Sequence, residues 1–378
     1  MLWGLGFRPF FLLASAFAAL SVPLWAMQFS GMLGRPYLPG ALWHAHELLF
    51  GFALAVIVGF LLTAGRTWSN RSTATGVLLM ALVMLWLTAR VLVLTPWGWA
   101  AALVNTAFPM SAAIALAIPF HAARNRRNYF FVGLLLMIAA AVLTFHLAQL
   151  QFLTLPSWLG IQVALDVVLF IMAVISGRVI PLFTNNGVPG ALAARQAAVE
   201  RTALGSVLAL LLTDALQVRG APLAALLAFG AVSHLARWLL WRPWKTLHVP
   251  LVWVLHLAYV WIPVHLALRA ASTLGYISAS VSTHSLTVGA IGGLTLGMMA
   301  RTARGHTGRP LRADAFDVAC YVLVTSAALV RVGAPLIAPA AMLHAVLGSA
   351  ALWSASFLLF CVRYWRVLSR ARIDGKPG

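Results

Sequence analysis

Apolar residues dominate long stretches of this chain, and polar residues gather between them. Twelve stretches have roughly the 20 apolar residues that a helix needs to cross the hydrocarbon core of a bilayer. They lie at 10–29, 44–64, 74–95, 97–119, 130–153, 158–177, 201–217, 221–241, 248–271, 279–300, 314–333 and 336–361. The pattern predicts an all-α, polytopic helical membrane protein of about 12 transmembrane helices, with a single domain over residues 1–378.

The composition agrees with this pattern. Hydrophobic residues make up 62% of the chain and charged residues only 9%, whereas a soluble domain carries about 25% charged residues. The composition therefore excludes an ordinary soluble domain. The two cysteines, Cys320 and Cys361, form no CxxC or CxxCH motif, which argues against a redox dithiol and against covalently attached haem.

Basic residues indicate the orientation of the helices. Of the 26 Lys and Arg residues, five fall on one side of the predicted helices, namely Arg35, Arg90, Arg219, Arg269 and Arg331. The rest fall on the side that holds both termini, which the positive-inside rule makes cytoplasmic. The net charge of +19 thus reflects topology and contact with anionic lipids. We expect no nucleic-acid partner, because no basic segment carries interleaved aromatic residues.

Ionisable residues inside the predicted helices are candidates for function, because such groups are rare and costly in a membrane. With this topology, most of them lie in the outer leaflet and His256 lies near the middle. The ones with the clearest functional potential are His44, His46, Glu47, His146, Asp166, His256 and His284. For His265 and His344, ordinary structural hydrogen bonding is the preferred interpretation.

Helical periodicity sorts the residues of the second segment into faces. On a regular helix His44 and Glu47 share a face that continues through Gly51 and Gly59, while His46 points away from His44. The small residues on this face allow close approach of another helix or of a flat ligand. In the tenth segment, glycines at 289, 293 and 297 form a similar stripe. It is typical of helix packing, or of room for a porphyrin beside His284.

The available side chains favour particular cofactors. Neutral imidazole is a good ligand for iron and copper, and the scarcity of thiolates argues against iron–sulfur or zinc–thiolate sites. Glu47 or Asp166 would orient a ligating imidazole or relay protons during catalysis. For Asp166 the alternative is a structural bond to Gln162, one helical turn earlier.

Six motifs, in order along the chain, resemble the NnrS family. They are GFRPFFL (6–12), WHAHELLFGF (43–52), GFLLTA (59–64), GRVIPLFTNN (177–186), WVLHLAY (253–259) and HSLTVGAIGGLTLGMMARTARGHTGR (284–309). The resemblance implies a twelve-helix bacterial inner-membrane protein that contains haem and copper and acts in the nitric oxide response. Two motifs depart slightly from the family pattern, with HELLFG for HEMLFG and a GRTWSN segment after GFLLTA, and neither change removes a potential ligand.

The resemblance also identifies candidate ligands. The motif histidines of this chain are His44, His46, His256, His284 and His306, and His146 falls in the family's histidine-bearing fifth helix. Without a CxxCH motif the haem is expected to be haem b. We expect His256 and His284 to be its axial ligands, and His44, His46 and His146 to bind copper. In the rival assignment, His44 or His46 ligates haem and copper lies elsewhere.

Three motifs fall on the predicted cytoplasmic side, around Arg8, Arg178 to Asn186, and Arg301 to Arg309. Their glycines, prolines and asparagines predict turns and helix caps, so tight loop closure is the simplest interpretation. Alternatively Arg8, Arg178, Arg301 and His306 converge to bind an anion, a quinol headgroup or haem propionates.

The resemblance favours a protein that binds and reduces nitric oxide, with a quinol or cytochrome as electron donor. A second hypothesis within the resemblance is a haem-based scavenger or sensor without turnover. A third, from another class, is a secondary transporter, whose twelve-helix architecture fits although the halves of the chain show no clear repeat.

Overall fold

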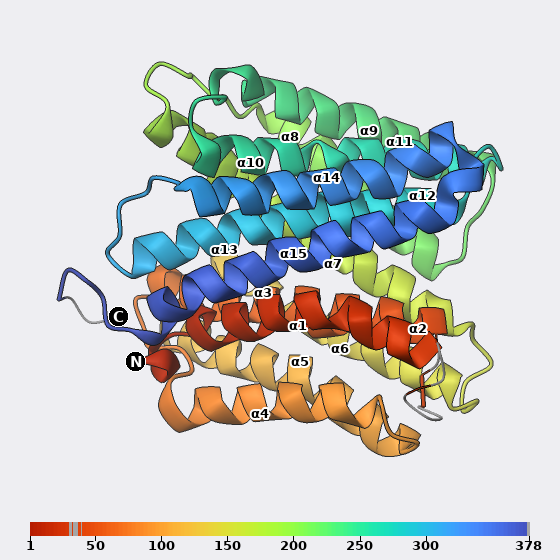
Figure 1. Ribbon diagram of the computed structural model, residues 1–378, viewed down its shortest axis with the longest axis horizontal. Helices are drawn as coiled ribbons and strands as arrows, with labels where there is room; N and C mark the ends of the chain where they lie inside the picture. Colours follow the sequence, from red (N-terminus) through yellow and green to blue (C-terminus); the bar gives the residue numbers. More distant parts are fainter. Residues whose placement is uncertain (30–31, 33–36, 39, 376–378) are drawn as a thin grey trace. The chain divides into compact units, whose positions relative to one another are not determined.

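The computed structural model describes residues 1–29, 32, 37–38 and 40–375, and all regular structure in this part of the chain is helical (Figure 1). Arg35 and Lys376 lie outside the described residues. The chain divides into two compact units, which are described separately below. The prediction of one domain over residues 1–378 remains a prediction.

Unit 1 comprises Met1–Val167, Thr302–Arg309 and Cys361–Gly378. Its helices are α1 (Phe7–Phe29), α2 (Gly40–His46), α3 (Leu54–Ser69), α4 (Gly76–Leu92), α5 (Gly98–Ala122) and α6 (Phe130–Gln149), with short 3-10 turns at Leu2–Gly4 and Arg126–Asn128. Helix α7 (Ser157–Gly187) begins in this unit. Helices α1 and α3 pack closely: the Phe7 amide donates to Thr63 Oγ1 at 3.0 Å, and Gly59 lies against Phe10.

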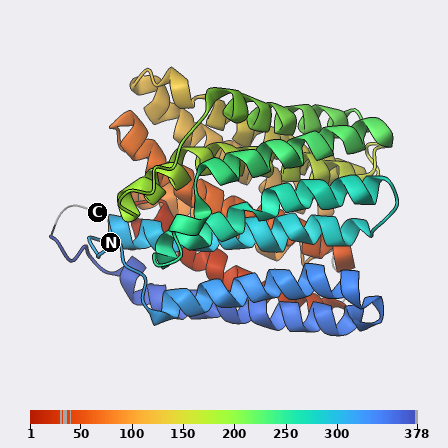
Figure 2. The same cartoon turned by 90° about the horizontal axis from the view of Figure 1, so that it is seen from above.

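Unit 2 comprises Val168–Arg301 and Pro310–Phe360. Its helices are α8 (Ala197–Ala215), α9 (Ala221–Leu240), α10 (Pro250–Tyr259), α11 (Trp261–Thr273), α12 (Ala279–His284), most of α13 (Gly293–His306), α14 (Ala315–Ile337) and the first part of α15 (Met342–Ser369), with 3-10 turns at Pro243–Lys245 and Pro339–Ala341. Helix α14 and the first part of α15 lie side by side in both views (Figures 1 and 2). Ser349 and Ser356 of α15 donate to Ala327 O and Cys320 O of α14, each at 2.9 Å.

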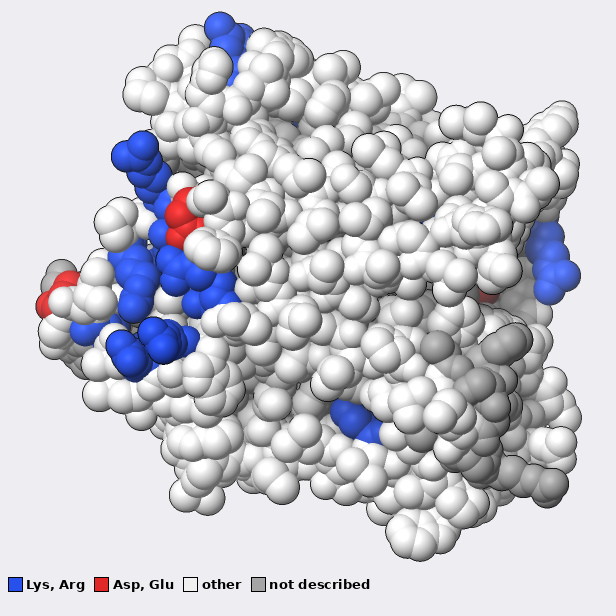
Figure 3. Space-filling model, viewed as in Figure 1, with Lys and Arg blue, Asp and Glu red and all other residues white. Residues whose placement is uncertain are grey.

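Nine helical segments of the described chain are long and apolar enough to cross a membrane. They confirm the prediction of a polytopic helical membrane protein, and most of the face drawn in Figure 3 carries no charge. Three predicted segments fall outside the nine: α4 has only 17 residues, α8 carries Glu200, Arg201 and Asp214, and residues 279–300 are rich in Ser, Thr and Gly. The count of about 12 and the cytoplasmic termini therefore remain predictions.

Two π-helical segments interrupt the α-helices, and each begins directly after a motif histidine. The first, η2 (Glu47–Ala53), follows His46, and the second, η5 (Ser285–Gly292), follows His284. A π segment widens the helix locally and is frequent at functional sites. A sequence analysis based on 3.6 residues per turn cannot predict such a segment. The grouping of residues 44–51 into helix faces that it gave therefore does not hold.

The glycine stripe of η5 and α13 is filled by protein side chains. A Cβ on Gly289 would lie 2.4 Å from the Trp261 ring, and one on Gly292 would lie 2.5 Å from Trp353. Gly293 is equally close to Ala258. The stripe therefore serves close packing within unit 2, which is the simpler of the two interpretations. Trp and Ala side chains occupy the space beside these glycines that a porphyrin would need.

The prediction of turns holds at two of the three basic motifs and is wrong at the third. Gly6 lies in a turn directly before α1, and Gly308, with φ of 74°, lies in a turn directly after α13. Residues 178–186 instead lie inside α7, which runs on to Gly187. Helix α7 includes Pro181 in its interior. Proline and glycine are tolerated inside membrane helices. Backbone groups that lose their helical hydrogen bond there find other partners among neighbouring groups. In this setting they are poor indicators of helix ends.

Candidate functional site

A buried pair of histidines lies inside unit 1. His46, at the end of α2, and His146, in α6, have their Nε2 atoms 3.1 Å apart. Both side chains are fully buried, and their rings meet edge to face with centroids 4.9 Å apart. Phe50 and Phe145 flank the His46 ring. The structure thus brings His146 together with His46, and the expectation that they bind copper remains a prediction.

Glu47 connects this histidine pair to a buried arginine. Its Oε1 atom lies 2.7 Å from Nδ1 of His46 and also accepts a bond from Nη1 of Arg90 in α4. Regular helical geometry placed Glu47 on the face of His44, whereas in the structure its carboxylate bonds the adjacent His46, at the start of the π segment. Arg90 donates its other terminal nitrogen to Asn105 Oδ1 in α5. A carboxylate on Nδ1 fixes the tautomer and orientation of an imidazole.

A glycine and a tryptophan position Arg90. A Cβ on Gly51 would lie 2.8 Å from Arg90 Nη1 and 2.7 Å from the Phe17 ring, so only glycine leaves room for the guanidinium. Trp86 donates its Nε1–H to Gly51 O at 2.9 Å and lies below Arg90, 5.9 Å from ring centroid to Cζ. The π segment and α4 are therefore fastened together beside Glu47.

Tyr37 completes the chain of contacts at the other end. Its hydroxyl lies 3.2 Å from His146 Nδ1 and 3.3 Å from His146 O, and its ring stacks on the imidazole. Burial raises the pKa of Tyr37, so the phenol keeps its proton. When that proton goes to the His146 carbonyl, the phenol oxygen accepts Nδ1–H from His146. The Nε2 lone pair of His146 is then available, like that of His46, whose Nδ1–H is held by Glu47.

Two imidazole lone pairs at this separation suit a metal that accepts nitrogen ligands. Copper favours such ligands and binds them more tightly than other divalent first-row metals. Within the described residues no three His, Cys, Asp or Glu side chains form a group that could hold a metal ion, so His46 and His146 offer two nitrogen atoms here and no third such side chain joins them. His44 is half-buried, and its ring lies 5.0 Å from that of Trp25.

Unit 2 holds three histidines whose rings are each anchored through one nitrogen. Thr184 donates its hydroxyl proton to Ile180 O, so it accepts Nε2–H from His256 at 2.8 Å. His265 donates Nδ1–H to Ser282 O at 2.7 Å, and His284 donates Nδ1–H to Ser280 O at 2.7 Å. Among the described residues, Nδ1 of His256 and Nε2 of His265 are buried without a hydrogen-bond partner.

His256 and His265 each leave one ring nitrogen without a hydrogen-bond partner, and a neutral imidazole with such a nitrogen is the form that ligates haem iron. A backbone carbonyl on Nδ1–H is the usual orienting partner of a ligating histidine, and His265 and His284 both have one. The Nε2 atom of His284 lies 3.4 Å from Arg331 Nη2. Sequence reasoning singled out His256 and His284 and treated His265 as structural, because nothing in the sequence shows which ring nitrogen is bonded.

The other predicted site residues have the following surroundings. Gln162 donates to Asp166 Oδ1 at 3.1 Å, the bond that a structural role for Asp166 requires. Arg8 and His306 belong to unit 1, where His306 packs against Phe7 with ring centroids 5.6 Å apart. Arg178 and Arg301 belong to unit 2, where the Arg301 guanidinium lies 3.7 Å above the Phe183 ring.

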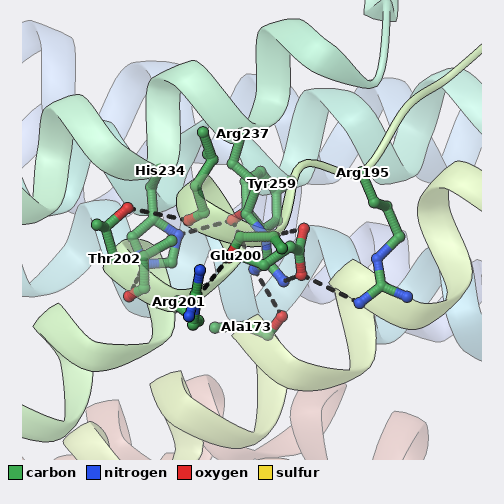
Figure 4. Close-up of polar contacts among 11 residues, drawn as sticks. Ala173, Arg195, Glu200, Arg201, Thr202, His234, Arg237 and Tyr259 are labelled. Carbon is green, nitrogen blue, oxygen red and sulfur yellow. Dashed lines mark hydrogen bonds and ion pairs between the residues drawn. The ribbon is translucent and has the colours of Figure 1, made fainter.

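Sequence reasoning missed a buried ion pair in unit 2, which Figure 4 shows. Arg237 donates Nε to Glu200 Oε1 at 2.9 Å and Nη2 to Oε2 at 2.6 Å. Its Nη1 donates to Ala173 O and to the Tyr259 hydroxyl, and that hydroxyl lies 2.6 Å from His234 Nδ1. The clue was available in Glu200, since the chain has only seven acidic residues.

The comparison with protein families gives one decisive match: the model of the NnrS protein family matches residues 1–372. The chain belongs to the NnrS family. No curated protein matches the chain. The match covers the WHAHE motif with its π segment and the second π segment after His284, so the buried histidine pair and the three anchored histidines are features of an NnrS chain.

Proposed function

We propose that this NnrS protein is a haem- and copper-containing protein of the bacterial inner membrane that binds nitric oxide and reduces it to nitrous oxide. The balanced reaction is 2 NO + 2 e⁻ + 2 H⁺ → N₂O + H₂O, with a quinol or cytochrome as the electron donor. Membership of the NnrS family suggests a role in the nitric oxide response. The nine apolar helices suggest that the protein is embedded in a membrane.

The observation that carries the proposal is the buried pair of Nε2 atoms, 3.1 Å apart. In this proposal His46 and His146 hold copper through these atoms, Glu47 orients His46, and Arg90 keeps Glu47 in place. The haem ligands come from His256, His265 and His284, each of which is anchored through one ring nitrogen. When bound, haem and copper would supply open coordination positions and the redox change for nitric oxide. The expectations that Glu47 delivers protons and that Asp166 relays them stay predictions.

The test is a metal and haem analysis of the full-length protein purified in detergent, followed by measurement of nitrous oxide. We expect copper and acid-acetone-extractable protohaem, and steady-state nitrous oxide production with a quinol or cytochrome donor. The variants His46→Ala and His146→Ala should lose copper and nitrous oxide production. His344→Ala is the matched control, because His344 is exposed.

The same measurements decide between the alternatives. Haem and copper that bind nitric oxide without sustained nitrous oxide production would identify a scavenger or sensor. Protein that carries neither cofactor would overturn the proposal and favour a secondary transporter.

A further inference from the structure

Arginines crowd together in unit 1 where α1 begins and where α13 and α15 end. Electrostatic interaction links Arg8 to Arg309 and Arg372, and links Arg309 to three more arginines. His306 lies within the field of Arg372, Arg8 and Arg66. The arginine cluster, as we call it, consists of Arg8, Arg66, Arg304, Arg309, Arg363, Arg370 and Arg372.

The cluster has a large excess of positive charge. Unit 1 contains three acidic residues among its described positions, and two of them are bonded elsewhere: Glu47 to His46 and Arg90, and Asp166 to Gln162. The third, Asp374, receives Nε and Nη2 of Arg372. Like charges that lie this close repel one another, and the repulsion grows where water is partly excluded.

Two of these arginines are buried, unlike ordinary basic residues on a cytoplasmic face. Arg8 is 1% exposed and Arg304 is 8% exposed. Burial, followed by the charges of Arg363 and Arg304, lowers the pKa of Arg309. By comparison Arg312 is exposed. Topology alone requires positive charge near the membrane surface, but it does not require burial of that charge.

Two buried guanidinium nitrogens lack a partner within the described residues. Nη1 of Arg8 caps the end of α15 by donating to Leu368 O at 2.9 Å and Arg370 O at 2.7 Å, but Nε of Arg8 is buried with no acceptor. Nη1 of Arg309 is also buried with no acceptor. A buried N–H without an acceptor is costly, and more so when it is charged. An anion with several acceptor oxygens would satisfy both nitrogens.

We propose that the arginine cluster binds a phosphate group, with Arg8 Nε and Arg309 Nη1 among its donors. A phosphate presents oxygens in several directions, and the planar guanidinium matches it with two parallel hydrogen bonds. The group belongs either to the head of an anionic phospholipid, which basic pockets at the membrane surface bind, or to free inorganic phosphate, which offers guanidinium groups the same oxygens. In Figure 3, blue side chains gather near the place where Figure 1 marks the C-terminus, which belongs to this unit. The proposal is independent of haem, copper and nitric oxide.

The test compares the full-length wild-type protein with Arg309→Gln and with Arg312→Gln, whose exposed arginine provides the matched control. Native mass spectrometry after extensive detergent washing measures retained phospholipid. Thermal unfolding in phosphate and in chloride of equal ionic strength measures binding of the free ion. At phosphate concentrations 100-fold above Kd we expect the wild-type midpoint to rise by about 5 °C.

The outcomes separate the two sources. Phospholipid that stays on the wild type and on Arg312→Gln but leaves Arg309→Gln identifies a lipid head group. A phosphate-specific rise in the midpoint without retained lipid, lost only in Arg309→Gln, identifies the free ion. Wild-type protein that neither retains phospholipid nor responds to phosphate overturns the proposal, and so does equal loss in both variants. Because the wild-type measurements decide this, the test holds even when Arg309→Gln fails to fold.

Discussion

The Nε2 atoms of His46 and His146 lie 3.1 Å apart although the two residues are 100 positions apart in the sequence. Each ring has a partner at Nδ1: the carboxylate of Glu47 for His46 and the phenol of Tyr37 for His146. Each partner holds its ring through Nδ1, and the two Nε2 atoms therefore face each other. This arrangement fixes the separation of the two nitrogen atoms that we propose as copper ligands.

Arg90 is expected to act on copper through Glu47. In Arg90→Lys the charge remains, but a single ammonium group cannot bridge Glu47 and Asn105 as the guanidinium does. Because Glu47 then orients His46 less firmly, copper affinity should fall by roughly 10- to 100-fold. Competition with a Cu(I) chelator measures this. Arg331→Lys, in unit 2, is the control, and unchanged copper affinity in Arg90→Lys would rule out the positioning role.

His44 distinguishes the two assignments of the second helical segment. Its ring packs against Trp25, whereas His46 faces His146. We therefore expect His44→Ala to keep more copper than His46→Ala when copper and haem are measured on the same preparations. Loss of haem from either variant would instead support the rival assignment, in which this segment ligates haem.

The three anchored histidines of unit 2 give a test of haem ligation. His256→Ala and His284→Ala should lose the haem absorption band while the protein stays monodisperse, and His265→Ala should do the same if its Nε2 is an axial ligand. His234→Gln serves as a control, because both ring nitrogens of His234 already bond within the protein, to Tyr259 and Ala203. Normal haem content in all three alanine variants would show that the ligands lie elsewhere.

Hydropathy predicted the fold class well, since an apolar stretch of about 20 residues has few alternatives to a membrane helix. The ends of the helices were less predictable. The second-last turn of α7 carries Pro181, whose usual meaning as a helix breaker does not hold inside a membrane protein. The π segments after His46 and His284 escape any analysis based on a regular period.

The candidate site was predictable in its residue types and only partly in its contacts. The histidine motif pointed to His46, and the resemblance added His146. Arg90 counted only as one charge on the outer side, yet it is 6% exposed and bonded to Glu47. Periodicity along one helix does not show which residue of another helix faces it, so Arg90, Asn105 and Tyr37 became visible only in the structure.

The ion pairs of Glu200 give a prediction about the stability of the protein. Two arginines bond this carboxylate, and the more exposed one provides the control. Arg237, with its side chain 1% exposed, and Arg195, 51% exposed, both bond Glu200. Arg237→Met leaves a largely buried carboxylate without its main partner and should cost about 3–5 kcal/mol. Arg195→Gln should cost about 1 kcal/mol or less, because exposed ion pairs contribute little. Thermal unfolding in detergent measures both, and equal losses would contradict the distinction.

A glycine beside the same ion pair tests its geometry. A Cβ on Gly177 would lie 1.8 Å from Arg237 Nη2, whereas a Cβ on Gly205 has no atom within 4 Å. Gly177→Ala should therefore displace Arg237 and lower the unfolding temperature. Gly205→Ala should leave it unchanged or raise it, because alanine favours a helix by up to about 1 kcal/mol over glycine. A Gly177→Ala protein as stable as wild type would show that Arg237 finds another position at no cost.

The topology prediction is tested by reporters placed at helix ends. An activity reporter inserted after Asn70, Asn128 or Gly305 should report the cytoplasm, and one inserted after Gly275 should report the periplasm. Gly34, a further periplasmic position, lies outside the described residues. Asn70 and Gly275 suit insertion because both have positive φ at the end of a helix, at 50° and 84°, so the chain already turns there. A periplasmic signal after Asn128 would place α6 in the opposite orientation, and His146 would then no longer lie in the outer leaflet where the positive-inside rule puts it.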